Sequence, residues 1–153
     1  MKRLFALVMI AGLCQTAWAQ DAMEKAMEKR AREMHRVIGL NSKDEWKKFI
    51  QENYTKALID KPMQAKVSTS DSDAPNSSSE TKSAGNIEAK ASMFERLHDD
   101  FGGSKIASIK ATGDKLEMVL DNGDMAGTFV LKFSKEKPYL IDGMGIQVGE
   151  GRR

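Results

Sequence analysis

The stretch that decides the fold is GGSKIASIKATGDKLEMVLDNGDMAGTFVLKFSKEKPYLIDGMGIQVG, residues 102–149. Alternating and β-branched runs, separated by short turns that contain Gly, Asp or Pro, predict four β-strands in it. We expect these strands at 106–112, 115–121, 128–133 and 139–148. Asn122-Gly123 is typical of a tight primed turn, in which both central residues take positive φ angles. Strands joined by such short connections are antiparallel neighbours, so the stretch predicts an antiparallel sheet.

The side chains of these strands indicate how the sheet packs. Leu116, Met118 and Leu120 alternate with more polar neighbours, and the third strand repeats the pattern. One apolar face and one mixed face are expected when helices cover a single side of an antiparallel sheet. Gly143 and Gly145 interrupt the last strand and predict a bulge or a sharp bend there.

Three helices are predicted before the sheet. Apolar residues recur at helical spacing in 21–38, and again from residue 87 to residue 101. Ser42 followed by Glu45 is a capping box, which starts the middle helix before Pro62. The predicted apolar face of that helix consists of Trp46, Phe49, Ile50, Tyr54, Ala57 and Leu58. We therefore expect an α+β domain with three helices packed on one face of a curved four-stranded antiparallel sheet, a cystatin-like or cone fold.

The segment at about 67–85 consists almost entirely of Ser, Thr, Asp, Asn, Glu and Lys. Such a composition cannot bury enough apolar surface to offset the entropy of ordering the chain. We interpret it as a disordered Ser-rich loop inside one domain, residues 20–153, because the pieces on either side look too small to fold separately.

The first nineteen residues have the pattern of a secretory signal peptide. Lys2 and Arg3 precede an apolar run at 4–13, and Ala17-Trp18-Ala19 is a small-x-small cleavage site. The apolar run is too short to span a bilayer. We predict cleavage after Ala19 and a periplasmic or secreted protein; the alternative is a buried N-terminal helix.

The predicted mature chain excludes several classes of chemistry. Cys14, the one cysteine, leaves with the signal peptide, so thiol nucleophiles and disulfides are excluded. Of 24 basic residues, Lys2 and Arg3 also leave, and the remaining 22 balance 22 acidic residues. A net charge near zero gives no electrostatic footprint for nucleic acid, and we expect no membrane span after cleavage.

Four motifs together resemble a known family: FERLHDDFGG at 94–103, KIASI at 105–109, GTFVLKF at 127–133 and KPYLIDGMGIQVG at 137–149. They are similar to those of an exported bacterial branch of the nuclear transport factor 2-like superfamily, which has the cone fold. The resemblance covers about residues 42–149 apart from the Ser-rich loop. In that branch the domain often precedes a β-lactamase-type serine hydrolase, which implies that this chain could be an accessory subunit of such an enzyme.

Asp142 is the candidate catalytic residue, since it lies in a strand among apolar residues beside a glycine. A carboxylate in an apolar cavity can shuttle protons because burial tunes its pKa. The alternative is an aspartate that stabilises a bulge through backbone N–H groups. The candidate ligand-binding residues, expected around the concave face of the sheet, are Trp46, Tyr54, Phe94, Phe129, Tyr139 and Asp142.

The other sequence patterns do not identify a catalysed reaction. Ser79-x-x-Lys82 and Ser134-x-x-Lys137 lack the companion motifs of penicillin-recognising enzymes, so we interpret both as chance matches. His98 and Asp99 are helical neighbours that point in different directions and cannot simply pair. We predict no metal site and no cofactor. Five methionines favour core filling over a soft binding surface: Met27, Met34, Met93, Met118 and Met144.

These observations favour a small exported, non-catalytic binding or interaction module of the cell envelope. Its partner would be another envelope protein or a small apolar ligand, and Val119 and Val130 on the mixed face are candidates for a homodimer contact. One alternative is a small isomerase- or hydrolase-type enzyme that uses Asp142, with Tyr54 or Tyr139 as a hydrogen-bond donor. The other alternative is the accessory subunit of a separate serine hydrolase.

Overall fold

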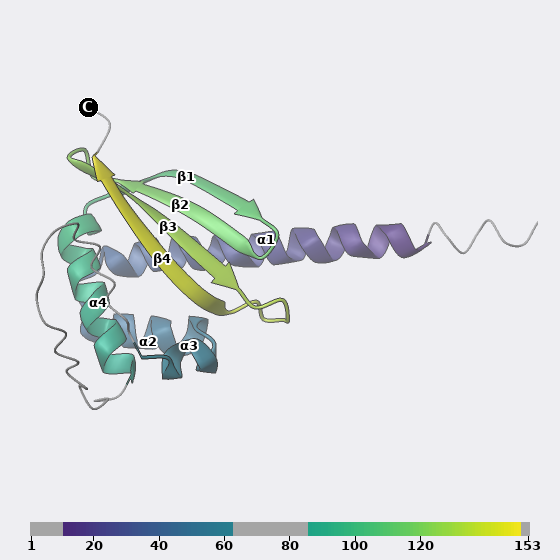
Figure 1. Cartoon of the computed structure of the whole chain (residues 1–153), viewed down its shortest axis with the longest axis horizontal. Coiled ribbons are helices and arrows are strands. Elements are labelled where there is room, and N and C mark those ends of the chain that lie inside the picture. Colours follow the sequence, from purple (N-terminus) through teal and green to yellow (C-terminus); the bar gives the residue numbers. More distant parts are fainter. Residues whose placement is uncertain (1–10, 63–85, 151–153) are drawn as a thin grey trace, which may run out of the picture.

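The computed structural model describes residues 11–62 and 86–150, and shows an α+β arrangement of four helices and one open four-stranded sheet (Figure 1). The elements in chain order are α1 (Ala11–Ile38), α2 (Lys43–Asn53), α3 (Lys56–Asp60), α4 (Asn86–Phe101), β1 (Lys105–Thr112), β2 (Lys115–Asp121), β3 (Met125–Phe133) and β4 (Ile141–Glu150). The α+β class and the four antiparallel strands are confirmed. The predicted Ser-rich loop and the start of the predicted signal peptide lie outside the described residues.

The sheet is an antiparallel meander with strand order β1-β2-β3-β4. Its registers place Ile109, Met118, Phe129 and Ile146 in one row across all four strands. Because successive residues of a strand point to opposite faces, such rows give the sheet one apolar face. The helices lie on that side, and α1 runs along the sheet and extends beyond it (Figure 1).

The β2–β3 turn differs from the predicted primed turn. Gly123 has a positive φ of 95°, but Asn122 is not in the left-handed region. Instead the Asn122 Oδ1 accepts the backbone N–H groups of Asp124 at 3.0 Å and Met125 at 2.9 Å. A short polar side chain that hydrogen-bonds the backbone ahead of it closes this turn without a second positive φ angle.

The middle predicted helix is two helices. Ser42 caps α2 as expected, accepting the Glu45 N–H at 3.5 Å. The chain then leaves the helix at Tyr54, where φ is −97° and ψ is 147°, and the Thr55 hydroxyl caps α3 by accepting the Leu58 N–H at 3.1 Å. The prediction of one continuous helix was therefore wrong. The Thr55 side chain accepts a free N–H group of the first turn of α3, which starts a new helix within the apolar pattern.

The core lies between the sheet and α1, α2 and α4. Its largest fully buried side chains include Phe94, Phe101 and Phe129. Phe101 packs edge-on against Phe129, with ring centroids 5.4 Å apart, and lies directly over Gly127 in β3. A Cβ atom at Gly127 would come within 2.5 Å of the Phe101 ring, so the aromatic packing requires glycine there.

Candidate functional site

The face of the sheet that the helices cover is filled by the protein's own side chains. Trp46, Phe94 and Phe129, three of the predicted ligand-binding residues, are at most 3% exposed. Trp46 donates its indole N–H to the Val37 carbonyl at 2.8 Å, and Phe94 packs against Phe49 with centroids 5.7 Å apart. These three side chains therefore build the core of the described molecule.

An open cleft lies instead between β4 and the helices α3 and α4, with a volume of about 560 Å³. We call it the β4 cleft. Its lining residues are Tyr54, Leu58, Lys61, Pro62, Lys90, Met93, Asp142, Gly143, Met144, Gly145 and Ile146. Met27, Met34 and Met118 are buried core residues as predicted, whereas Met93 and Met144 are partly buried and line this cleft.

The structure brings Tyr54 and Asp142 together at the end of the β4 cleft. Thr55 donates its backbone N–H to the Ile141 carbonyl at 2.8 Å, which forms a parallel bridge to the start of β4. The Thr55 hydroxyl also donates to Asp142 Oδ1 at 2.8 Å. The Tyr54 hydroxyl is buried and contacts Met144 Sδ at 3.8 Å. Burial raises the pKa of Tyr54 well above its usual value, so its hydroxyl stays protonated and is a donor at neutral pH.

Asp142 itself is exposed rather than enclosed in an apolar cavity. The β3–β4 register shifts between Lys132 and Phe133, which pair with Gly143 and Ile141, so Asp142 is the extra residue of a bulge. The predicted bulge in the last strand is confirmed, and the carboxylate is held by a threonine hydroxyl from the α2–α3 corner.

Lys90 is a site residue that the sequence analysis missed. Its side chain is 4% exposed, and its ammonium donates to the Ile59 carbonyl at 2.9 Å and the Lys61 carbonyl at 2.8 Å. Burial lowers the pKa of Lys90. Its position four residues before Phe94 and seven before Leu97 places it on the buried stripe of α4, which is the signal that could have identified it.

The remaining predicted residues lie elsewhere. Tyr139 is 9% exposed and precedes β4 with a φ of 58°. His98 hydrogen-bonds the Ile38 carbonyl at 2.8 Å, and His35 hydrogen-bonds the Ser104 carbonyl at 3.0 Å. Within residues 11–62 and 86–150, no group of three or more His, Cys, Asp or Glu side chains is placed to hold a metal ion.

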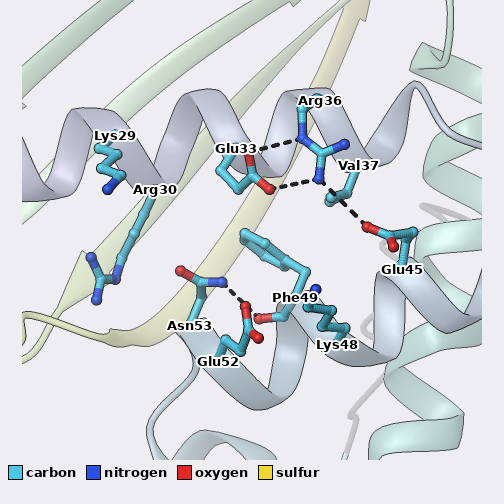
Figure 2. A pocket seen from close by; sticks show the side chains of 10 residues that line it. All are labelled: Lys29, Arg30, Glu33, Arg36, Val37, Glu45, Lys48, Phe49, Glu52 and Asn53. Carbon is cyan, nitrogen blue, oxygen red and sulfur yellow. Dashed lines mark hydrogen bonds and ion pairs between the residues drawn. The ribbon is translucent and has the colours of Figure 1, made fainter.

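A second cavity of about 380 Å³ lies between α1 and α2 (Figure 2). We call it the α1–α2 pocket. It is lined by Lys29, Arg30, Glu33, Arg36, Val37, Glu45, Lys48, Phe49, Glu52 and Asn53. Arg36 donates to Glu33 at 2.9 and 2.7 Å and pairs with Glu45 at 3.5 Å. None of these charged residues stood out in the sequence, because exposed charges on helices are common.

Comparisons with protein-family models, curated proteins and solved structures gave no match. Among the helices of the described residues, none has a long enough apolar run to cross a membrane.

Proposed function

We propose that the protein is a non-catalytic interaction module that binds an extended segment of a partner protein along the β4 edge. The observation that carries this proposal is the β4 cleft, a partly apolar opening beside a sheet edge. That edge has few features that would discourage the pairing of another strand. In this mode of recognition, called β-strand addition, main-chain hydrogen bonds supply affinity and side-chain pockets supply specificity.

The two edges of the sheet differ in their protection. β1 carries Lys105 and Lys110, and its register is interrupted by an irregularity between Ile106 and Ser108. Lysines and bulges are devices that discourage strand addition at an edge. By contrast, residues 143–149 of β4 contain three glycines and no charged side chain, and Val148 is 62% exposed. The bulge of β4 at Asp142 precedes this stretch, so β4 is the edge better suited to accept a partner strand.

The free backbone groups of β4 follow from the register. Phe133 in β3 donates its N–H to the backbone carbonyl of Asp114, so this N–H points toward β2 and away from β4. Backbone groups alternate between the two sides of a strand, so Lys132, Val130 and Thr128 point their N–H and C=O groups toward β4. Their register partners in β4, which are Gly143, Gly145 and Gln147, therefore hydrogen-bond to β3. The residues between those partners, Met144, Ile146 and Val148, therefore present their N–H and C=O groups away from the sheet.

The chain already uses this edge once. Tyr54 and Ile141 form a parallel bridge, in which the Thr55 N–H donates to the Ile141 carbonyl, at the point where the β4 cleft begins. A partner segment that continued in the direction of this bridge would run along β4. Its alternate side chains would then face Leu58, Met93 and Met144, and flexible methionines adapt well to different apolar side chains.

The same geometry favours binding over catalysis and over a ligand inside the cone. Trp46, Phe94 and Phe129 occupy the space in which a small apolar ligand would sit. Asp142 is exposed and held by Thr55, which supports a structural role for this carboxylate. Pairing with a separate serine hydrolase stays a prediction, as does a homodimer through Val119 and Val130 on the face opposite the helices.

The test is a peptide-display selection against residues 20–153, followed by affinity measurements on two variants at one exposed position. Val148→Pro removes an outward N–H, and proline is tolerated on edge strands. Val148→Thr keeps that N–H and changes only the side chain. We expect Val148→Pro to weaken a selected peptide about tenfold, the value of one hydrogen bond of about 1.4 kcal/mol, and Val148→Thr to leave it nearly unchanged.

Circular dichroism of both variants provides the folding control. Enrichment of no peptide, or equal binding by the two variants, would contradict strand addition at β4. Concentration-dependent dimerisation that Val148→Pro abolishes would show that the edge serves a second copy of this chain rather than a partner protein.

We further propose that the chain is exported and has the cone fold of the nuclear transport factor 2-like superfamily. Helices on one face of a four-stranded meander support the second point. The basic Lys2-Arg3 start, the apolar run at 4–13 and the small-x-small pattern at 17–19 support the first. The N-terminal residue of protein from an envelope fraction tests export, and Gln20 is expected.

A further inference from the structure

The turn between β2 and β3 contains Asn122-Gly123, a pair of residues with a chemical reactivity of its own. Asparagine is a thermolabile residue, because the backbone nitrogen that follows it can attack its side-chain amide carbon. Glycine favours this attack, since it has no Cβ atom to crowd the nitrogen. Asn122 and Gly123 are both exposed, so water reaches them. The turn is therefore a candidate site of covalent modification, whose rate depends on how the fold holds these two residues.

The reaction is the deamidation of Asn122. The Gly123 nitrogen loses its proton and forms a bond to Cγ of Asn122, the Cγ–Nδ2 bond breaks, and the amide group leaves as ammonia. Water then opens the cyclic succinimide at either of its carbonyl groups, which gives aspartate or isoaspartate. The net change consumes water, releases ammonia and needs no oxidant or reductant.

The attacking nitrogen is held by a neighbouring side chain. The Gly123 N–H donates to Asp121 Oδ1 at 2.8 Å. A carboxylate at this distance disfavours removal of the proton, because the nitrogen would become a second negative charge beside it. The contact between Asp121 and Gly123 therefore opposes the first step of the reaction.

The amide group of Asn122 is also held in place. Its Oδ1 accepts the N–H groups of Asp124 at 3.0 Å and Met125 at 2.9 Å. Its Nδ2 donates to the Asp100 carbonyl at 2.7 Å. Rotation of the amide toward the Gly123 nitrogen would break these bonds, so the folded turn also opposes the formation of the ring.

The bond to Asp100 connects the turn with the last turn of α4, where helix carbonyls lack partners within the helix. An aspartate at position 122 would still accept hydrogen bonds, but it would have no donor for the Asp100 carbonyl. Isoaspartate would in addition lengthen the backbone of the turn. Deamidation would therefore disconnect the β2–β3 turn from α4.

We propose that Asn122 is a deamidation site that the folded turn protects, with Asp121 holding the attacking nitrogen, and that its reaction releases the turn from α4. The reaction then proceeds from the unfolded chain or from transient openings of the turn. None of these residues lines the β4 cleft, so the inference does not rest on the proposed interaction edge.

The experiment follows the deamidation of Asn122 in residues 20–153 by peptide mapping and mass spectrometry. Folded protein is compared with protein unfolded in guanidinium chloride at the same pH. We expect the folded protein to react at least about tenfold more slowly, the ratio for an opening step that breaks a hydrogen bond or more. Equal rates in the two states would overturn the proposal.

Two variants of the same turn test the role of Asp121. Asp121→Ala removes the acceptor of the Gly123 N–H and should speed deamidation of the folded protein by about threefold to tenfold. Asp124→Ala is the matched control, because it removes the same charge from a side chain that makes none of the hydrogen bonds described in this turn. Circular dichroism checks that both variants fold, and equal rates in the two variants would overturn the role of Asp121.

Asn122→Asp places the product in the turn without the reaction. It keeps acceptors for the Asp124 and Met125 N–H groups and loses the donor to Asp100, so the equilibrium constant for unfolding should rise about tenfold. The rise should persist at high salt, which screens repulsion from Asp121 and Asp124. An unchanged constant, or a rise that salt abolishes, would overturn the proposed link between the turn and α4.

Discussion

Replacing Gly127 with alanine probes the packing between α4 and the sheet. The added Cβ would lie 2.5 Å from Phe101 Cζ and 2.8 Å from Phe101 Cε1, with Phe129 Cε2 at 3.2 Å. Carbon atoms normally pack about 3.5–4.0 Å apart, so the Phe101 ring would have to retreat by roughly 1 Å. Phe101 is 1% exposed, and its neighbours leave it little room to move.

Two opposing effects set the magnitude for Gly127→Ala. Overpacking a well-filled core costs about 1–3 kcal/mol. Alanine also has less conformational freedom than glycine in the unfolded chain, which stabilises the folded state by about 0.4–1 kcal/mol. The steric effect is larger, so we expect the free energy of unfolding to fall by about 1–2 kcal/mol. For a domain of this size, that corresponds to a melting temperature lower by about 4–8 °C.

The assay compares urea unfolding of Gly127→Ala with that of Gly145→Ala. Gly145 is exposed, lies in the neighbouring strand opposite Val130, and has no atom within 4 Å of an added Cβ. Its φ angle is not positive, so alanine there should be neutral or slightly stabilising. Combining Gly127→Ala with Phe101→Leu should cost less than the two changes separately, because the smaller side chain relieves the clash. Equal stability of the two alanine variants would refute the reasoning.

Two further changes test buried hydrogen bonds. Lys90→Met should lower the free energy of unfolding by about 1–2 kcal/mol, because the Ile59 and Lys61 carbonyls lose their donor. Urea unfolding measures this change. Lys61→Met, at an exposed position, is the control and should change the free energy of unfolding by less than about 0.5 kcal/mol. Trp46→Phe should lower the free energy of unfolding by about 2–3 kcal/mol, since the indole fills core volume and donates to the Val37 carbonyl. Unfolding followed by circular dichroism measures this change. A decrease below about 0.5 kcal/mol would contradict the buried hydrogen bond.

The sheet was the most predictable part of the fold because its signals are local. Alternation with period two and the short turns placed β2 at residues 115–121, where the structure has it. β3 begins at Met125, before its predicted start at Thr128, since the Asn122 side chain closes the preceding turn early. β4 begins at Ile141 rather than Tyr139, because Tyr139 adopts a φ of 58° that no strand residue takes.

The break between α2 and α3 was not predictable from hydrophobic periodicity. The apolar positions continue from Trp46 to Leu58 as if one helix carried them. The break depends on Thr55, whose hydroxyl caps α3 and also reaches Asp142 in β4. That second contact joins residues 87 positions apart, and a single sequence gives no sign of which distant group will bind a threonine side chain.

The candidate sites were predictable only in part. Tyr54 and Asp142 were identified, and the structure brings both to the β4 cleft. The apolar candidates Trp46 and Phe94 became core, because large aromatic residues on helical stripes are usually buried by the sheet they cover. The charged residues that line the α1–α2 pocket come from two helices, and the spacing of charges along one helix does not reveal which residues of another helix they will face.

The strand order of the sheet has a consequence for how the molecule folds. Each strand pairs with its neighbour in sequence, and the hairpins β1–β2 and β2–β3 are joined by turns of a few residues. Short loops close quickly, whereas contacts between distant residues form slowly because more chain entropy is lost. The bond between Thr55 and Asp142 belongs to the second kind. We therefore expect the meander to form early in refolding and the corner at the start of β4 to be completed late.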